Sequence, residues 1–277
     1  FWVSYPEMVK LGGGVPVIIK TDIEHDFKIT AEQLEAAITP KTKAFIINTP
    51  CNPSGSVFTK AELAAIAGVL AKHPNIIVIS DEIYEYIQYN QKHESMGQFT
   101  ELKDRMVIVN GVAKGYAMTG WRIGYIAAPQ AIVKATNKIQ GQYTSGICTI
   151  AQAAALKAME LTPENSPEIQ AMLKAFRKRR DMLHDMLNEI PGVKCNMPAG
   201  AFYVFPEVKS YYGKTDGETT IKGSDDLCMF LLYNAHVACV AGNAFGNDDC
   251  IRLSYATSED KLIEAVKRIK AALAKLH

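Results

Sequence analysis

The sequence has 277 residues, which is enough for one large domain or two smaller ones with buried cores. Apolar residues make up 48% of it, charged residues make up 21%, and the formal net charge is +1. This balance is typical of a globular protein and gives no sign of a nucleic-acid-binding or membrane-binding surface.

Strand-length apolar runs alternate with helical patterns over the first 160 residues. This alternation predicts an α/β fold with a largely parallel sheet, in which ligands bind beyond the carboxyl ends of the strands. Thr30 and Thr59 are predicted helix N-caps, and Thr59 with Glu62 forms a predicted capping box. The predicted strands are 15–19, 43–48, 76–80, 106–110 and 123–127, and the predicted helices are 30–38, 59–72, 130–139 and 150–159.

A long charged amphipathic helix is predicted at 168–189, closed by Pro191 and Gly192, and it is expected to join two domains. A smaller α+β unit follows it. We therefore predict a large domain at 1–165, and a linking helix with a small C-terminal domain at 166–277. The remaining predicted strands are 201–205, 237–240 and 251–255, and the remaining helices are 225–233 and 258–276, the last with Ser258 as N-cap.

The six cysteines contain no Cys-x-x-Cys pair, and the six histidines contain no pair at ligand spacing. We expect free thiols in a reducing cytoplasm and no metal site. No apolar run reaches the roughly 20 residues of a membrane span. The first residues lack an initiator Met and the basic and apolar regions of a signal peptide, so we expect the sequence to begin within a longer protein.

Four segments place an unusual polar residue where a predicted strand ends or in the turn after it. They are 48–55, 80–84, 110–125 and 252–255. Each polar residue taken singly has a simple explanation: Asn52-Pro53 as a turn, Asp81 as a cap, Lys114 as a solvated lysine. All four segments in this order favour a functional site instead.

In this order the segments resemble the class I/II aminotransferases, which are fold-type-I pyridoxal-phosphate enzymes, and are close to prokaryotic aspartate aminotransferases. The most specific part runs from Lys114 through Gly120, Trp121 and Arg122 to Tyr125, with the lysine eight residues before the arginine. The resemblance covers essentially the whole chain from Trp2 and implies a mainly parallel large domain with a smaller α+β domain. Family members carry a further segment before this tryptophan, with a Gly-rich phosphate turn, so the large domain is expected to be incomplete here.

The resemblance implies pyridoxal 5′-phosphate as the cofactor, held by Lys114 as a Schiff base. The freed amine would then carry the proton between the substrate α-carbon and the cofactor, a role that suits lysine because its pKa falls readily on desolvation. Asp81 matches the carboxylate that keeps the pyridine nitrogen protonated. Tyr84 and Asn52 match the groups that donate hydrogen bonds to the ring oxygen O3′.

The remaining site residues also follow from the resemblance. Arg122 matches the arginine that binds the cofactor phosphate, Trp2 the aromatic ring that stacks on the cofactor, and Arg252 the clamp for the substrate α-carboxylate, which Asn52 also contacts. A cis bond is implied between Asn52 and Pro53.

Two departures from the family pattern are visible. Ala113 and Gly111 stand where many relatives have phosphate-binding serines, and Ala241-Gly242 stands where they have Pro-Gly. We therefore expect phosphate binding to depend on Arg122 and backbone N–H groups.

The implied activity is a ping-pong transamination in a homodimer, with aspartate and 2-oxoglutarate as the first choice of substrates. Aromatic amino acids, alanine and prephenate stay open. The alternatives are a carbon–sulfur lyase on the same fold and a non-catalytic aminotransferase-like regulatory domain. Partners other than the substrates and a second copy, such as nucleic acid or a membrane, are not expected.

Overall fold

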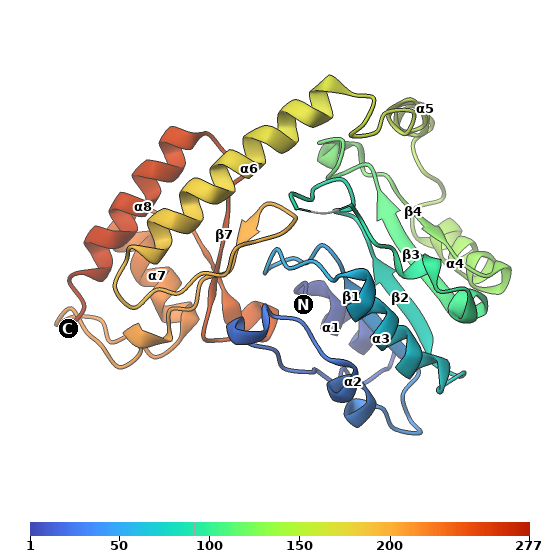
Figure 1. The fold of residues 1–277 in the computed structure, drawn as a ribbon, viewed down its shortest axis with the longest axis horizontal. Coiled ribbons are helices and arrows are strands. Elements are labelled where there is room, and N and C mark those ends of the chain that lie inside the picture. The colour runs from blue at the N-terminus through green and yellow to red at the C-terminus, as the bar shows by residue number, and fades with distance from the viewer. Residues whose placement is uncertain (91) are drawn as a thin grey trace. The chain divides into compact units, whose positions relative to one another are not determined.

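The computed structural model describes residues 1–90 and 92–277 (Figure 1). The chain forms two compact units. The sheet unit contains Ile29–Pro50 and Val57–Leu173, and the C-terminal unit contains Phe1–Lys28, Cys51–Ser56 and Lys174–His277. These units differ from the predicted division after residue 165, because two early segments belong with the C-terminal residues.

The sheet unit contains four strands in the order β1-β2-β3-β4, with the first three parallel and the last antiparallel. The register pairs Asn48 with Asp81, Asp81 with Val109, and Gly111 with Gly124. The carboxyl ends of the three parallel strands and the start of β4 therefore share one edge of the sheet. The strands are β1 (Ala44–Asn48), β2 (Ile77–Asp81), β3 (Met106–Gly111) and β4 (Gly124–Ala127).

The helices of the sheet unit begin close to the predicted positions. Both Thr30 and Thr59 are N-caps with complete capping boxes, the first with Gln33 and the second with Glu62. Leu63 and Leu70 of α3 are fully buried, so this helix contributes to the core. The helices are α2 (Ala31–Ala37), α3 (Lys60–Ala71), α4 (Gln130–Tyr143) and α5 (Thr149–Ala158).

The first 28 residues differ most from the prediction. The strand expected at 15–19 is wrong: these residues form no strand, and Val15 and Val17 are 85% and 71% exposed. Pro16 cannot donate to a strand ladder, which removes one hydrogen bond that a central strand would need. A short helix that was not predicted, α1 (Ser4–Leu11), precedes this segment.

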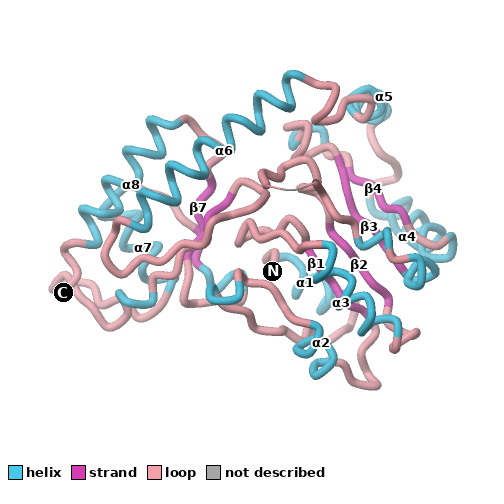
Figure 2. Tube along the Cα trace, in the orientation of Figure 1, coloured by secondary structure: helices cyan, strands magenta, loops and turns pink. Residues whose placement is uncertain are grey.

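The C-terminal unit has a three-stranded antiparallel sheet in the order β5-β7-β6. Its strands are shorter than predicted, and much of the chain between its helices is loop (Figure 2). An ion pair between Lys178 Nζ and Glu259 Oε2, 2.6 Å apart, joins two of its helices. The elements are α6 (Pro167–Asn188), β5 (Tyr203–Val204), α7 (Ser224–Ala235), β6 (Val240–Ala241), β7 (Ile251–Ser254) and α8 (Glu259–Leu273).

The boundary between the two units, at Leu173 and Lys174, lies inside the long helix α6.

Within the described part of the chain, no helix has both the length and the apolar character required to cross a bilayer.

Candidate functional site

Asp81 is the last residue of β2 and is fixed at the shared edge of the sheet. Its carbonyl oxygen accepts from Asn48 Nδ2 at 2.9 Å and from the Thr49 N–H at 3.1 Å. Its carboxylate Oδ1 accepts from the Ile83 N–H at 3.2 Å, which begins the turn after the strand. The half-buried carboxylate is therefore held at the carboxyl end of the strand, where α/β sheets bind ligands.

Tyr84 and Lys114 lie together beyond this edge. The Tyr84 side chain is only 3% exposed, and Lys114 Nζ lies 5.8 Å from the centroid of its ring. Lys114 is half-buried in the turn after β3, and its carbonyl oxygen accepts from the N–H of Ala117, a residue with φ of 54°. The structure thus brings a lysine amine next to a buried phenol.

Arg122 lies where the chain returns into β4. It adopts a left-handed conformation with φ of 57°, and its Nη1 donates to the Thr119 carbonyl oxygen at 3.0 Å. Because β4 runs antiparallel to β3, the residues that follow β3 and the residues that precede β4 leave the same edge of the sheet. Arg122 therefore lies on the same side of the sheet unit as Asp81, Tyr84 and Lys114.

Gly111 explains one of the two departures from the family pattern. A Cβ atom at this position would lie 2.8 Å from the Ile123 carbonyl oxygen and 3.0 Å from the Gly124 Cα atom. The backbones of β3 and β4 leave no space for a serine here. A phosphate group would therefore have to find its donors on Arg122 and on backbone N–H groups.

A second set of predicted residues lies in the C-terminal unit, around the turn at Cys51–Ser56. The peptide bond between Asn52 and Pro53 is cis, which confirms the prediction, and Thr49–Pro50 is also cis. Gly55 has φ of 69°, and its carbonyl oxygen accepts from the N–H groups of Ala199 and Gly200 at 2.9 and 2.8 Å. These bonds fix the turn that carries Asn52.

Arg252 bonds to this turn from β7. Its Nη1 donates to Asn52 Oδ1 at 3.0 Å, and its guanidinium carbon lies 4.6 Å from the Tyr203 ring and 4.9 Å from the Phe245 ring. Its Nε–H is buried and has no hydrogen-bond partner among the described residues. A buried N–H without a partner is costly, and a ligand carboxylate would satisfy it.

The second departure from the family pattern shapes this environment. Gly242 packs so tightly that a Cβ atom would lie 2.2 Å from the carbonyl oxygens of Asn247 and Cys250. The short helical turn Gly242–Phe245 places the Phe245 ring against Arg252. The turn is therefore tight without the proline of the family. Sequence reasoning missed the roles of Phe245 and Tyr203, because aromatic side chains carry no signal of stacking on an arginine.

Trp2 is half-buried, and its ring makes an edge-to-face contact with Tyr5 at 5.5 Å. It belongs to the C-terminal unit with Asn52 and Arg252, whereas the other four predicted residues belong to the sheet unit. The structure therefore places Trp2 and Asn52 with Arg252 and not with the residues of the predicted large domain, and the roles of all seven residues toward a cofactor stay predictions.

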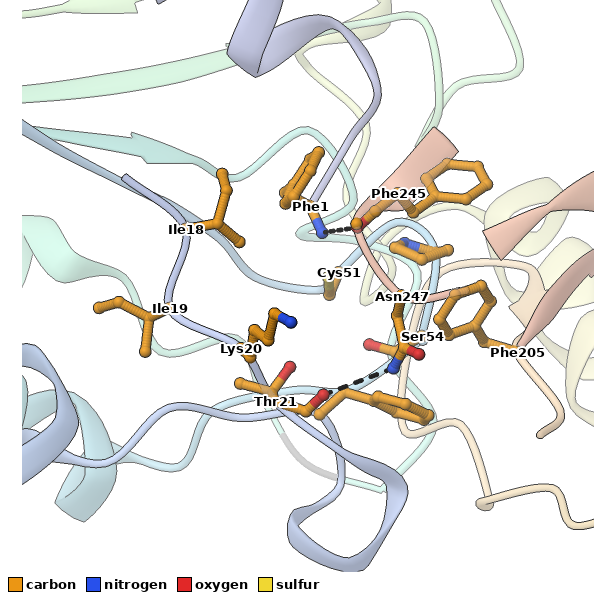
Figure 3. Close-up of a pocket in the computed structure, with 13 residues that line it drawn as sticks. Phe1, Ile18, Ile19, Lys20, Thr21, Cys51, Ser54, Phe205, Phe245 and Asn247 are labelled. Atoms are coloured by element: carbon orange, nitrogen blue, oxygen red, sulfur yellow. Dashed lines mark hydrogen bonds between the residues drawn. The ribbon is translucent and has the colours of Figure 1, made fainter. Parts of the chain in front are cut away.

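The C-terminal unit also contains a small cavity beside the Cys51–Ser56 turn (Figure 3). Its volume of about 50 Å³ is too small for pyridoxal phosphate, since pockets for small-molecule ligands are usually several hundred Å³. Figure 3 shows the Phe1 amine bonded to the Phe245 carbonyl oxygen and the Asn247 amide bonded to that of Thr21. Within residues 1–90 and 92–277, no cluster of three or more His, Cys, Asp or Glu forms a metal site.

Comparison with known families gives a match over residues 1–269 to the family described as aminotransferase class I and II. A bifunctional aspartate aminotransferase and glutamate/aspartate-prephenate aminotransferase of Petunia hybrida is 48% identical over 275 residues. That alignment covers 99% of this chain and 57% of the petunia protein, so the chain spans little more than half of this relative. An aspartate/prephenate aminotransferase of Cereibacter sphaeroides is 46% identical, with 100% of this chain and 69% of that protein covered.

Solved structures agree with the sequence comparison. The aspartate aminotransferase of Rhizobium meliloti superposes with a TM-score of 0.94 at 41% identity, covering 100% of this chain and 69% of that one. The aspartate aminotransferase of Thermus thermophilus with maleate gives a TM-score of 0.89 at 38% identity, covering 98% and 68%. The fold class predicted from the sequence, a fold-type-I α/β transferase, is confirmed.

Proposed function

Because the chain belongs to the class I and II aminotransferase family, we propose that it carries the cofactor-binding and substrate-binding residues of a pyridoxal-phosphate-dependent aminotransferase. Aspartate is the proposed amino donor and 2-oxoglutarate the proposed acceptor, and prephenate is a further acceptor suggested by the names of relatives. The observation that carries the proposal is the Lys114 amine beside the buried Tyr84 ring, at the sheet edge where β2 ends in Asp81.

The residues of the sheet unit fit the cofactor by their chemistry. Bound pyridoxal phosphate supplies a ring that accepts the electron pair released at the substrate α-carbon. Lys114 Nζ would be the attachment point and, once released, would move the proton at the α-carbon. The Asp81 carboxylate would hold a proton on the ring nitrogen, the Tyr84 hydroxyl would donate to the ring oxygen, and Arg122 would bind the phosphate.

The residues of the C-terminal unit fit a carboxylate. The planar guanidinium of Arg252 already has Nη1 bonded to Asn52, and its buried Nε–H lacks a partner among the described residues. A carboxylate on that side would receive a charge-assisted hydrogen bond beside the rings of Tyr203 and Phe245. We propose that Arg252 binds the substrate α-carboxylate, with Asn52 as a second contact. Cofactor contacts from Trp2 and Asn52 are proposed on family resemblance alone.

We also propose that the active protein is a homodimer. Large apolar side chains are exposed along the sheet unit after residue 120, which is unusual for a monomer surface. Examples are Ile139, Tyr143, Ile150 and Leu156, which are 61–85% exposed. A mass measurement in solution that gave a fully active monomer would contradict this proposal. A cytoplasmic location is proposed from the cysteines, which are scattered without a pairing motif.

The test is to find the lysine that the cofactor occupies. The full chain is loaded with pyridoxal phosphate, reduced with borohydride, digested and mapped by mass spectrometry. We expect the label on Lys114, no label on the active-site peptide of Lys114→Ala, and normal labelling in the exposed control Lys103→Ala. A label on another lysine, or none, would refute the proposal.

The reaction type is tested with the loaded protein. Aspartate alone is expected to give one turnover and then stop until 2-oxoglutarate is added. Continuous release of ammonia and pyruvate from a single amino acid would instead identify a lyase. A protein that holds the cofactor but converts no amino acid would support a regulatory role.

A further inference from the structure

Glu82 is a buried acid in the turn after β2 that the proposed function does not use. Its side chain is only 2% exposed. Its Oε1 accepts three hydrogen bonds, from Ser80 Oγ at 2.8 Å, from Ser95 Oγ at 3.0 Å and from the Met96 N–H at 3.1 Å. Burying a carboxylate is costly unless it is fully bonded, and here three donors meet one oxygen. The carboxylate therefore ties the end of β2 to the chain more than ten residues further on.

The second oxygen of Glu82 extends this network to His93. Glu82 Oε2 lies 2.7 Å from His93 Nε2, and Gln88 Nε2 lies 2.8 Å from His93 Nδ1. The Gln88 amide also donates to the Glu85 carbonyl oxygen at 3.2 Å. Since the Gln88 nitrogen is the donor to both groups, His93 Nδ1 accepts and His93 Nε2 donates to Glu82. Gln88 therefore donates to His93, and His93 donates to the Glu82 carboxylate.

The same turn is also tied to β3. The Glu82 N–H donates to the carbonyl oxygen of Val109 in β3 at 2.9 Å, and Asn110 Oδ1 accepts from the Gly111 N–H at 2.7 Å. Gly111 ends β3 and opens the segment that leads to Lys114. The turn that carries Tyr84 is therefore bonded on one side to the strand that ends in Asp81, and on the other side to the strand that leads to Lys114.

We propose that Glu82 is a positioning residue whose bonds to Ser80, to His93, to the Ser95 hydroxyl and to the Met96 N–H hold Asp81 and Tyr84 in fixed geometry relative to Lys114. This inference rests on the proposed function, in which all three residues contact one rigid cofactor. Such a cofactor is bound well only when the groups around it are held to within a fraction of an ångström by a supporting shell. The Glu82 carboxylate is bonded to Ser80 in the strand that ends in Asp81, and the Glu82 N–H is bonded to the strand that leads to Lys114, so this residue connects both groups of contacts.

The test uses Glu82→Gln, which keeps the size and shape of the side chain. One amide oxygen can still accept from Ser80, Ser95 and Met96, but the amide nitrogen then faces the His93 Nε2–H, so that two donors meet. The matched control is Glu94→Gln, whose acid accepts from the exposed Gln98 amide at 3.0 Å. Three quantities are measured on the full chain: the dissociation constant for pyridoxal phosphate, the pH midpoint of the bound cofactor's visible absorbance, and the thermal midpoint.

Glu82→Gln is expected to bind pyridoxal phosphate about tenfold more weakly and to shift the pH midpoint of the absorbance, while Glu94→Gln matches the wild type in both. His93→Gln in the same chain as Glu82→Gln supplies an acceptor for the new amide, and is expected to recover most of the affinity. If Glu82→Gln fails to fold, Ser80→Ala removes one donor only and is expected to weaken cofactor binding in the same direction by about threefold.

The outcomes separate this inference from the proposed function. A wild-type protein that binds no pyridoxal phosphate overturns the proposed function and this inference with it. The positioning role alone is overturned if the wild type binds the cofactor and both Glu82→Gln and Ser80→Ala equal it in affinity and absorbance midpoint. A loss of thermal stability without either spectroscopic change would also overturn it, because that is the result of a purely structural role.

Discussion

Replacing Arg252 with methionine is expected to weaken carboxylate binding strongly while leaving the stability of the protein nearly unchanged. The functional loss follows from the hydrogen bonds that the guanidinium would give to a carboxylate. Charge-assisted bonds contribute about 1.5–3 kcal/mol each, so losing a two-bond contact costs about 3 kcal/mol or more. At 1.4 kcal/mol for each factor of ten, the affinity for a dicarboxylate falls by at least about a hundredfold.

The effect of Arg252→Met on stability is a balance of terms of opposite sign. The guanidinium lies against the rings of Tyr203 and Phe245, and each such contact stabilises by about 0.5–1 kcal/mol. The Asn52 oxygen also loses its donor. Against this, the variant removes the buried Nε–H that has no partner among the described residues, a burden of about 1–3 kcal/mol. The terms nearly cancel, so the thermal midpoint is expected to move by less than about 5 °C.

The assay is a calorimetric titration of the cofactor-loaded protein with maleate, an unreactive dicarboxylate, together with a thermal melt. The matched control is Arg268→Met, because Arg268 pairs with Glu264 at 2.8 Å on the exposed surface of α8. Maleate affinity in Arg252→Met within threefold of the wild-type value would show that the carboxylate binds elsewhere. A large loss of stability would show that the buried Nε–H is satisfied in solution by a group that the structure does not contain.

Two further predictions concern the fold. Gly111→Ala is expected to lower the free energy of unfolding by about 1–3 kcal/mol in urea denaturation, because its Cβ would force the β3 and β4 backbones apart. Gly120→Ala is the neutral control, since no described atom lies within 4 Å of its Cβ. Equal midpoints for the two variants would contradict the close contact. Burial raises the pKa of the Cys195 thiol from 9.0 to about 12, and its S–H donates to the Asn196 carbonyl oxygen at 3.3 Å. The folded state thus holds this proton more tightly than the unfolded state, so its stabilising contribution is complete below pH 9 and is lost as the pH rises toward 12. Urea midpoints against pH are expected to fall less steeply in this range for Cys195→Ala than for the wild type, and parallel curves would contradict the assignment.

The sheet unit was well predicted because its signals are local. Ile77–Asp81 and Met106–Gly111 are runs of β-branched residues between polar turns, and the capping boxes of Thr30 and Thr59 fixed two helix starts. The row of polar residues at the strand ends followed from the rule that parallel strands end at one edge. Each of these features depends on a few neighbouring residues, which the sequence displays directly.

The features that were missed depend on contacts between distant segments. Helix α1 has only eight residues and none of its side chains is buried, so its pattern is too short to have indicated a helix. β5 and β6 contain two residues each, because each of them pairs with β7 over two residues. The length of this pairing is not visible in the composition of either strand. The network of Glu82, His93 and Gln88 has no periodic pattern, and its members become visible only when the turn is folded.

The C-terminal unit is assembled from three separate stretches of the chain, and this has a consequence for its synthesis. Gly55, made early, supplies the carbonyl oxygen that receives the N–H groups of Ala199 and Gly200, made much later. A ribosome must therefore pass Gly200 before these bonds can form, long after Gly55 has been made. A shortened gene that starts at Lys174 would produce a protein with those two amide protons left without their acceptor.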